Sequence, residues 1–210
     1  MGGLPMSLVL AGGNKNFIIV AGDQRVLDKE GQVLSENYRK VFKINEDFIV
    51  AFAGKIPYCK AILEPVLERE DKEETMFDNI NMSETIERRV RMADEELKKM
   101  DERCFFSIIV CGKTIHNQAK DAARNPLFMH VYNYNGSLSV KKNLLNDFGI
   151  RWSALYGSTY DHRKVCKQLF ERTHAITQNE VQKIFEQTIR NGARNDRTVN
   201  SNVMYEIIEA

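Results

Sequence analysis

FIIVAGDQR (residues 17–25) and RKVFKINEDFIVAFAG (residues 39–54) are the stretches that decide the fold. Each contains apolar runs of strand length beside turn-forming residues, a pattern typical of β-hairpins. The first run pairs with residues 7–11 across a turn at residues 12–16, and the second stretch folds on itself across residues 45–47. The sequence therefore predicts two successive hairpins near the start of the chain.

The rest of the chain alternates between pairs of helices and groups of strands. Apolar residues recur at helical spacing in four segments, and apolar runs of strand length mark five more. An acidic linker at residues 68–74 separates the first two helices, and Asn191-Gly192 is a stop signal for the last one. The predicted helices start near residues 56 and 83 and cover residues 161–172 and 178–190, and the predicted strands are residues 105–111, 127–134, 137–140, 153–156 and 203–208.

The order of these elements bears on the fold class. Helices that come in pairs argue against a parallel sheet built from βαβ units and favour a layered α/β sandwich. With 210 residues, 43% of them apolar, and without internal repeats, the chain is expected to form one large domain.

Composition excludes several classes of function. Thirty Lys and Arg against 29 Asp and Glu give a formal charge of +1, so nucleic-acid binding is not expected. The apolar runs are too short to span a membrane and no signal-type segment begins the chain. The four cysteines form no CxxC pair, which favours a reducing, cytoplasmic location. The four histidines are not at ligand spacing and no phosphate-binding loop motif occurs, so neither a metal nor a cofactor is expected.

Four blocks together resemble the successive signature segments of proteasome β subunits and of the simpler bacterial peptidase that works beneath an unfoldase ring. They are the two opening stretches, then YGSTYD at residues 156–161 and NDRTVNSN at residues 195–202. The length of the region between residues 113 and 147 is more similar to the proteasome branch. The resemblance implies a four-layer αββα sandwich of two antiparallel sheets, the N-terminal-nucleophile hydrolase fold, spanning residues 7–210 behind a short extension at residues 1–6.

The resemblance also implies a catalytic centre. In this family the side chain of the first mature residue attacks the peptide bond while its free α-amine serves as the base. Ser7 occupies that position in place of the usual Thr, Lys40 matches the essential lysine, Asp23 matches the acid that holds it, and Gly54 matches the oxyanion donor. Met6 precedes Ser7 where proteasome precursors usually have Gly, so we expect Ser7 to be exposed only if residues 1–6 are removed or translation starts at Met6.

Further residues complete the site that the resemblance implies. Ser158 and Asp196 match the polar residues around the nucleophile's amine. The family's next serine is Val199 here, with Thr198 or Ser201 as possible substitutes. Phe52 and Val26 are the candidate substrate-binding residues, and a Phe at the base of the first specificity pocket favours small or medium side chains before the cut.

Each of these candidate site residues also has a purely structural interpretation. Ser7 can simply open a strand, Lys40 can be a solvated strand-end charge, and Asp23 and Asp196 can be turn formers. Gly54 can serve only a strand-to-helix turn, and Phe52 can be plain core.

Three functions follow from the sequence. The first is an N-terminal-nucleophile endopeptidase that cleaves peptides or unfolded proteins within a homo- or hetero-oligomeric ring, with an ATPase or regulatory cap as a candidate partner. The second is a catalytically inactive subunit with a structural role in a ring. The third is a small-amide amidohydrolase on the same fold.

Overall fold

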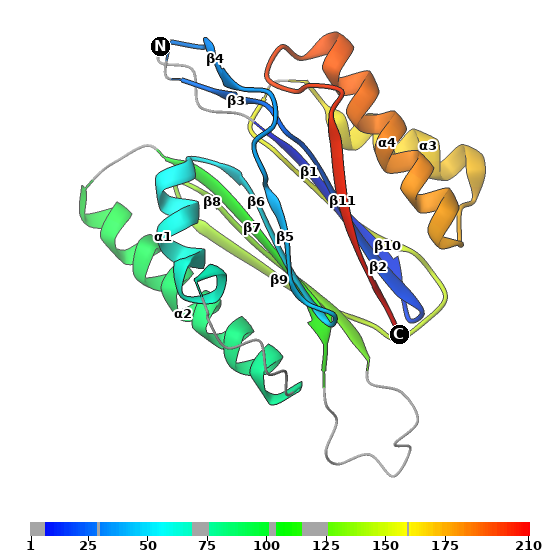
Figure 1. Cartoon of the computed structure of the whole chain (residues 1–210), viewed down its shortest axis with the longest axis horizontal. Helices are drawn as coiled ribbons and strands as arrows, with labels where there is room; N and C mark the ends of the chain where they lie inside the picture. Colours follow the sequence, from blue (N-terminus) through cyan, green and yellow to red (C-terminus); the bar gives the residue numbers. More distant parts are fainter. Residues whose placement is uncertain (1–6, 29, 69–75, 101–103, 115–125, 159) are drawn as a thin grey trace.

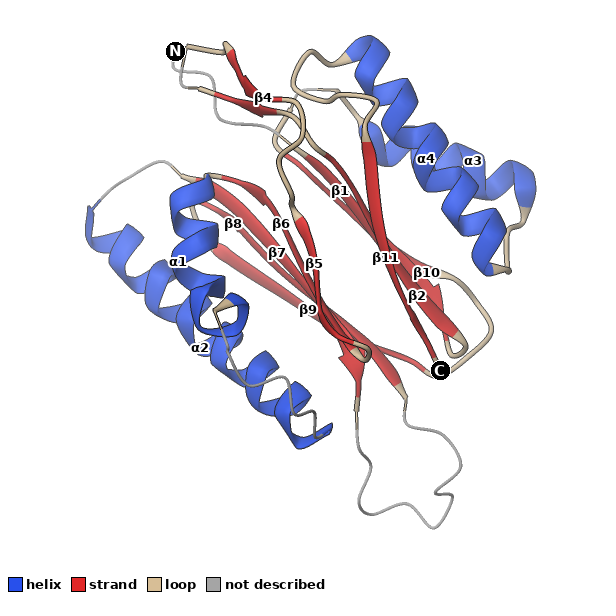
Figure 2. Cartoon of the chain, viewed as in Figure 1, coloured by secondary structure: helices blue, strands red, loops and turns tan. Residues whose placement is uncertain are grey.

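The computed structural model describes residues 7–28, 30–68, 76–100, 104–114, 126–158 and 160–210. Within them, two antiparallel sheets lie face to face and a pair of helices covers the outer side of each, as Figures 1 and 2 show. The four-layer sandwich implied by the resemblance is confirmed.

The first sheet has the strand order β10-β1-β2-β11 and lies under helices α3 and α4. Every neighbouring pair in it is antiparallel, including β11, which returns the end of the chain to the side of β2. Its elements are β1 (Leu8–Asn14), β2 (Phe17–Asp23), β10 (Arg151–Tyr156), β11 (Val203–Glu209), α3 (His162–Thr173) and α4 (Gln178–Asn195).

The second sheet has the order β5-β6-β7-β8-β9 and carries α1 and α2 on its outer face. A short two-stranded ribbon, β3-β4, follows β2. The elements are β3 (Val26–Leu27), β4 (Val33–Ser35), β5 (Val41–Asn45), β6 (Phe48–Gly54), α1 (Ile56–Leu67), α2 (Met76–Met100), β7 (Phe105–Lys113), β8 (Leu127–Asn135) and β9 (Leu138–Leu145).

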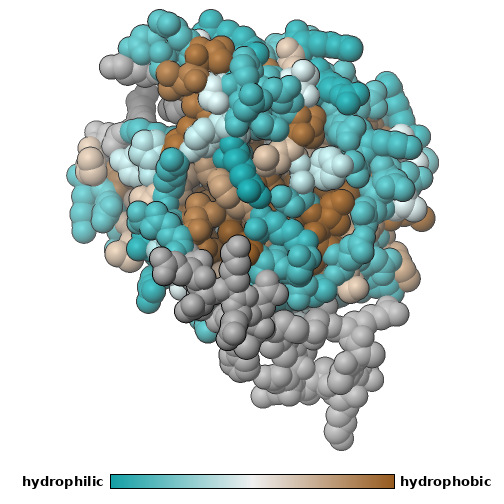
Figure 3. Space-filling model, in the orientation of Figure 1, coloured by the Kyte–Doolittle hydropathy of each residue, from teal (hydrophilic) through white to brown (hydrophobic). Residues whose placement is uncertain are grey.

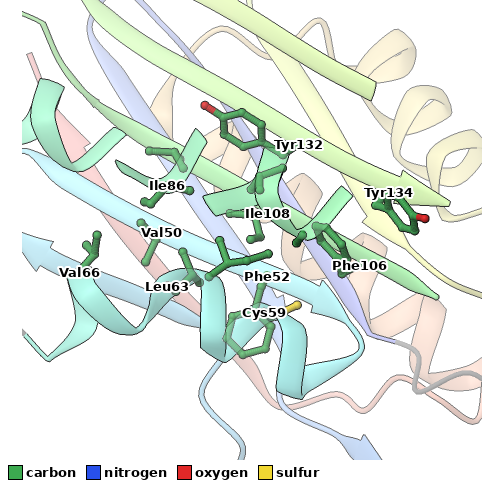
Figure 4. Packing of buried hydrophobic residues seen from close by; sticks show 14 of the residues in the cluster. Val50, Phe52, Cys59, Leu63, Val66, Ile86, Phe106, Ile108, Tyr132 and Tyr134 are labelled. Carbon is green, nitrogen blue, oxygen red and sulfur yellow. The ribbon is translucent and has the colours of Figure 1, made fainter. Parts of the chain in front are cut away.

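Side chains along each strand of the second sheet point alternately to its two faces. On β6, Phe48, Val50 and Phe52 pack against the helices, and the residues between them pack against the other sheet. Figure 4 shows Val50 and Phe52 beside Leu63 of α1 and Ile86 of α2. Both faces are buried, which explains why β6 reads as a continuous apolar run.

Both predicted hairpins form, but the first turn was placed wrongly. Asn14 pairs with Phe17, so the turn is only Lys15-Asn16, and the glycines at 12 and 13 belong to β1. The Asn14 side-chain amide donates to the carbonyl oxygens of Phe148 and Ile176, which fixes the end of the strand. These contacts come from distant parts of the chain, so the local pattern could not indicate them.

Two helix boundaries were also wrong. Helix α2 begins at Met76, and Ser83 lies inside it, where its hydroxyl pairs with His130 Nδ1 of β8. Helix α4 continues through Gly192 to Asn195 because the Gly192 position serves helix packing and not termination. The β3-β4 ribbon was not predicted, and most of the acidic linker at residues 68–74 lies outside the described residues.

Candidate active site

The ends of four strands meet at one end of the sandwich. Val9 of β1 pairs with Gly22 of β2, and Val41 of β5 pairs with Ala51 of β6. The start of each first strand therefore lies beside the end of its partner. Ser7 and Lys40 directly precede β1 and β5, and Asp23 and Gly54 end β2 and β6.

A buried ion pair joins the two sheets at this end. Lys40 Nζ donates to Asp23 Oδ1 over 2.9 Å and to the carbonyl oxygen of Arg25 over 2.6 Å. The side chains of Lys40 and Asp23 are 1% and 0% exposed. Lys40 is thus held inside the protein by its partners, and it is not a solvated strand-end charge.

Asp23 also holds the backbone beside Ser7. The amide of Leu8 donates to Asp23 Oδ1 over 2.8 Å, and the amide of Arg25 donates to Oδ2 over 2.9 Å. The same carboxylate oxygen therefore accepts from Lys40 and from the peptide group that links Ser7 to Leu8. This arrangement brings Ser7, Asp23 and Lys40 together, with Ser7 itself 8% exposed.

Burial changes the acidity of the lysine. Desolvation, the largest effect, lowers the pKa of Lys40, and the charge of Asp23 partly opposes it. A lysine of lowered pKa gives up its proton more readily than one in water. The Lys40 ammonium is therefore costly to bury, and it depends on Asp23 and the Arg25 carbonyl oxygen for its place in the site.

Gly54 ends β6 with φ +102°. A Cβ at this position would lie 2.4 Å from the carbonyl oxygen of Phe105 on β7. The fold alone requires glycine here, because both the left-handed backbone and the close approach of β7 exclude a side chain. The glycine is consistent with an oxyanion donor but does not by itself indicate one.

Ser158 and Asp196 lie together around a third residue, His162. The Nε2 of His162 is 2.8 Å from Asp196 Oδ2 and 3.2 Å from Ser158 Oγ. Ser158 Oγ also donates to the carbonyl oxygen of Tyr160. Leu8 pairs with Tyr156, so Ser158 comes two residues after the strand position opposite Leu8.

The environment of His162 fixes its tautomer. Its ring is fully buried, and its Nδ1 has no hydrogen-bond partner among the residues that the structure describes. An ionised Asp196 can only accept a hydrogen bond, so we assign the proton to Nε2. The ring packs on the backbone of α4 at Gly192, where an added Cβ would meet Cε1 at 2.8 Å.

Asp196 is held ionised by its neighbours. Burial opposes the charge, but hydrogen bonds outweigh it, those from His162 and Thr198 among them, and hold the pKa of Asp196 far below its usual range. Thr198 donates from both its amide and its hydroxyl to Asp196 Oδ1. Of the two possible substitutes for the missing serine, Thr198 is the one that contacts Asp196, whereas Val199 packs in the core under α3 and α4.

Sequence reasoning treated His162 as a packing or solvated histidine and gave Arg25 no role. Arg25 forms a bidentate ion pair with Glu36, 2.9 Å at the nearest contact, and donates to the carbonyl oxygen of Arg197 over 2.6 Å. Asn200 Nδ2 in turn donates to Glu36 Oε2. This network fixes the Arg25 carbonyl that accepts from Lys40, and the DQR and NSN triplets were its only sequence signal.

Phe52 packs in the core and also lines a cavity. It stacks on Phe42 with ring centroids 6.2 Å apart and meets Tyr38 edge-on. The cavity, about 600 Å³, lies between β5, β6 and α1, and Lys60 is on its rim. Val26, the other candidate substrate-binding residue, is buried in the β3-β4 ribbon, paired with Ser35.

Other features limit the chemistry of the described residues. Within them, no group of His, Cys, Asp and Glu side chains is arranged to hold a metal ion. All four cysteines lie in the described part of the chain, where they are buried and form no disulfide. Of the helices described, none has the length and apolar character of a membrane span.

The fold is the sandwich of the N-terminal-nucleophile class. The family model described as proteasome subunit matches residues 8–121, more than half of the chain, and the chain therefore belongs to the proteasome subunit family. The matched range contains Asp23, Lys40 and Gly54 and begins one residue after Ser7.

A solved structure agrees with this assignment. The fold is similar to that of eukaryotic HslV from Trypanosoma brucei, with a TM-score of 0.61 and 17% sequence identity over 97% of this chain and 99% of that one. No curated protein matches the chain.

Proposed function

We propose that the chain is a peptidase in which Ser7, once it is the first residue, attacks the carbonyl carbon of a peptide bond. The observation that carries this proposal is the buried Asp23–Lys40 pair on the carboxylate that also binds the Leu8 amide. Two charges removed from water reduce stability unless they are well paired, and a hydrophobic pair would serve packing equally well. A catalytic role is therefore the simplest explanation for a lysine that is buried beside Ser7, the residue that precedes β1.

The proposed steps assign one task to each residue. The Ser7 hydroxyl oxygen bonds to the carbonyl carbon, and its proton passes to the α-amine of Ser7, whose pKa in model peptides is about 8. The Lys40 ammonium stabilises the developing negative charge, and the Gly54 N–H donates to the oxyanion. The amine then gives the proton to the leaving nitrogen, and water hydrolyses the acyl–serine ester.

The roles of the remaining site residues are part of the same proposal. Ser158 and Asp196 orient the α-amine, with Thr198 in place of the missing serine. The cavity at Phe52 accepts the side chain that precedes the cleaved bond, and Val26 lies on the ribbon that follows Asp23. We further propose that the working form is an oligomeric ring, as the family membership favours, with an ATPase or other cap as a possible partner.

The test compares chains that begin at Met1 and at Ser7, with fluorogenic peptides as substrates. We expect turnover only when Ser7 is the first residue, and a loss of at least about a thousandfold in Ser7→Ala. The intact mass of the protein purified from its native source then shows which form exists. Equal turnover by both chains, or turnover that survives Ser7→Ala, would refute the assignment of the nucleophile.

A catalytically inactive ring subunit is the second candidate, and one observation favours it. Ser158 and Asp196 are both occupied by hydrogen bonds to His162, and Ser7 is mostly buried. A native protein that retains residues 1–6 and forms rings without turning over peptides would support this function. Cleavage of small amides but not of peptides would instead support the amidohydrolase.

A further inference from the structure

A polar cleft opens between the two sheets on the side away from the Phe52 cavity. Its volume is about 380 Å³, and its walls come mainly from β8, β9 and β10. Strands β9 and β10 are the edges of their sheets, so in the described part of the chain each has a paired neighbour on one side only. Edge strands present backbone N–H and C=O groups to which an extended peptide can bind.

The cleft reaches both halves of the candidate active site. Tyr156, which lines the cleft, pairs with Leu8, the residue after Ser7. Phe105, on the other wall, accepts a hydrogen bond from Lys55, the residue after Gly54. The Phe52 cavity lies on β5 and β6 and the cleft lies on β7 to β10, so the two are toward opposite edges of the five-stranded sheet. A peptide bound across Ser7 therefore has the Phe52 cavity on one side of its cleaved bond and the cleft on the other.

The charges in the cleft are all of one sign. Lys141 of β9 and Arg163 of α3 line it, and none of its described lining residues is acidic. The nearby Asp161 caps α3, with its Oδ1 accepting from the Lys164 amide and the Tyr156 hydroxyl. Both cations are exposed at their own positions. Hydrophilic residues cover much of the surface seen in Figure 3, so exposed charge alone does not indicate a site. Lys141 and Arg163 differ from other surface cations in that both line the same cleft.

Strand alternation distinguishes Lys141 from its neighbour. Lys142 points to the other face of β9, where its Nζ pairs with Glu87 of α2 over 2.5 Å. The remaining cleft walls carry neutral hydrogen-bonding groups, among them Asn133 and Ser139. Such a lining is suited to a carboxylate on an extended chain.

We propose that this cleft binds the residues that follow the cleaved bond and selects substrates with acidic side chains there. The proposal rests on the peptidase function proposed above. Lys141 and Arg163 hold the carboxylates, and the edge strands bind the backbone. The substrate class is therefore a peptide with Glu or Asp within a few residues after the cut.

Binding can be measured apart from cleavage. The Ser7→Ala chain is titrated with fluorescein-labelled pentapeptides whose first two residues are Glu-Glu, Gln-Gln or Lys-Lys, and binding is followed by fluorescence anisotropy. We expect the Glu-Glu peptide to bind about fivefold more tightly than Gln-Gln, as two partly exposed ion pairs allow. The preference should fall as salt is raised to 0.5 M, where charges are screened within a few ångströms.

Variants then locate the effect. Lys141→Gln and Arg163→Gln should each remove part of the preference, and the double variant should abolish it. Lys142→Gln removes the same charge from the opposite face of the same strand and should leave the preference unchanged. Equal binding of the three peptides, or a preference that survives the double variant, would overturn the proposal.

Cleavage by the chain that begins at Ser7 separates the two proposals. Internally quenched peptides identical before the cut and carrying the same three pairs after it should show the same order in kcat/KM. A Glu-Glu preference in binding without cleavage of any peptide would support the cleft and refute the peptidase function. Cleavage with equal kcat/KM for all three would support the peptidase and refute the acidic selection.

Discussion

Removal of Lys40 and removal of Asp23 should destabilise the protein unequally. Lys40→Met leaves the Asp23 carboxylate buried but still bonded to the amides of Leu8 and Arg25, so we expect a loss near the low end for a broken buried pair, about 3 kcal/mol. Asp23→Ala leaves both amides without their acceptor, and it leaves the buried lysine without its counter-charge and with only the Arg25 carbonyl oxygen as acceptor. That variant should lose about 5 kcal/mol or more.

Urea unfolding followed by circular dichroism measures these losses, and a double-mutant cycle isolates the pair. Because neither charge is stranded in the double variant, its loss should fall short of the summed single losses by about 1–3 kcal/mol. Lys43→Met is the matched control: Lys43 pairs with exposed Glu46 on the same hairpin and should cost no more than about 1 kcal/mol. Additive losses, or a Lys40→Met effect no larger than that of Lys43→Met, would refute this account of the site.

The pair also predicts a dependence on pH. Burial lowers the pKa of Lys40 in the folded state, so between that lowered value and the unfolded value of about 10.4 the unfolded chain binds more protons. The contribution of Lys40 to stability should therefore rise with pH across this window. Wild type should gain stability relative to Lys40→Met as the pH increases toward 10, and an unchanged difference would contradict the burial seen here.

Three further predictions use residues around the site. Gly54→Ala should lower the free energy of unfolding by more than about 3 kcal/mol in urea titrations, because its Cβ would clash with β7. Gly136→Ala, with φ +79° and open space around it, should lower it by only about 1 kcal/mol. Equal losses would contradict the close approach of β7 to Gly54. Gly192→Ala should destabilise the wild-type protein, because the added Cβ would clash with His162. In the His162→Ala variant it should instead stabilise the protein by up to about 1 kcal/mol, the usual gain for Ala over Gly inside a helix. A change in unfolding free energy of the same sign in both backgrounds would refute this packing. Hydrogen bonds hold the pKa of Asp196 below its unfolded value of about 3.9, so its contribution to stability is complete above that pH and is lost as the pH falls further. In His162→Ala the free energy of unfolding should therefore depend less on pH below 4. Urea titrations at pH 3 and 7 measure this difference.

The sequence predicted most of the fold because the fold depends on periodicity and order. The apolar runs of β2 and β6 are continuous since both faces of each strand are buried, and the paired helices excluded a parallel sheet. The errors fell where long-range contacts decide the structure. Asn14 ends β1 by bonding to residues more than 130 positions away, and no local rule gives the two-residue turn that results.

One part of the candidate site, the Asp23–Lys40 pair, was easier to predict than the other, the cluster around His162. The family resemblance named Asp23 as the acid that holds Lys40, and the two side chains form an ion pair in the structure. The cluster of Ser158, His162 and Asp196 was only half predicted, because a histidine four residues after a serine has no meaning until α3 turns it toward the end of α4. Motifs predict residues held by neighbouring strands better than residues held by packing between helices.

This difference bears on how the site is built. Asp23 and Lys40 connect the two sheets directly, so their geometry depends on the sandwich alone. Ser158 and Asp196 depend on His162, whose ring position depends in turn on the absence of a side chain at Gly192. A substitution in α4 can therefore change the orientation of Ser158 without touching the Lys40 side of the site. If Ser7 is the nucleophile, Gly192→Ala should reduce kcat with fluorogenic peptides more than it raises KM. In the His162→Ala background the same substitution should change kcat no further, which would show that its contact with the His162 ring, and not global stability, carries the effect.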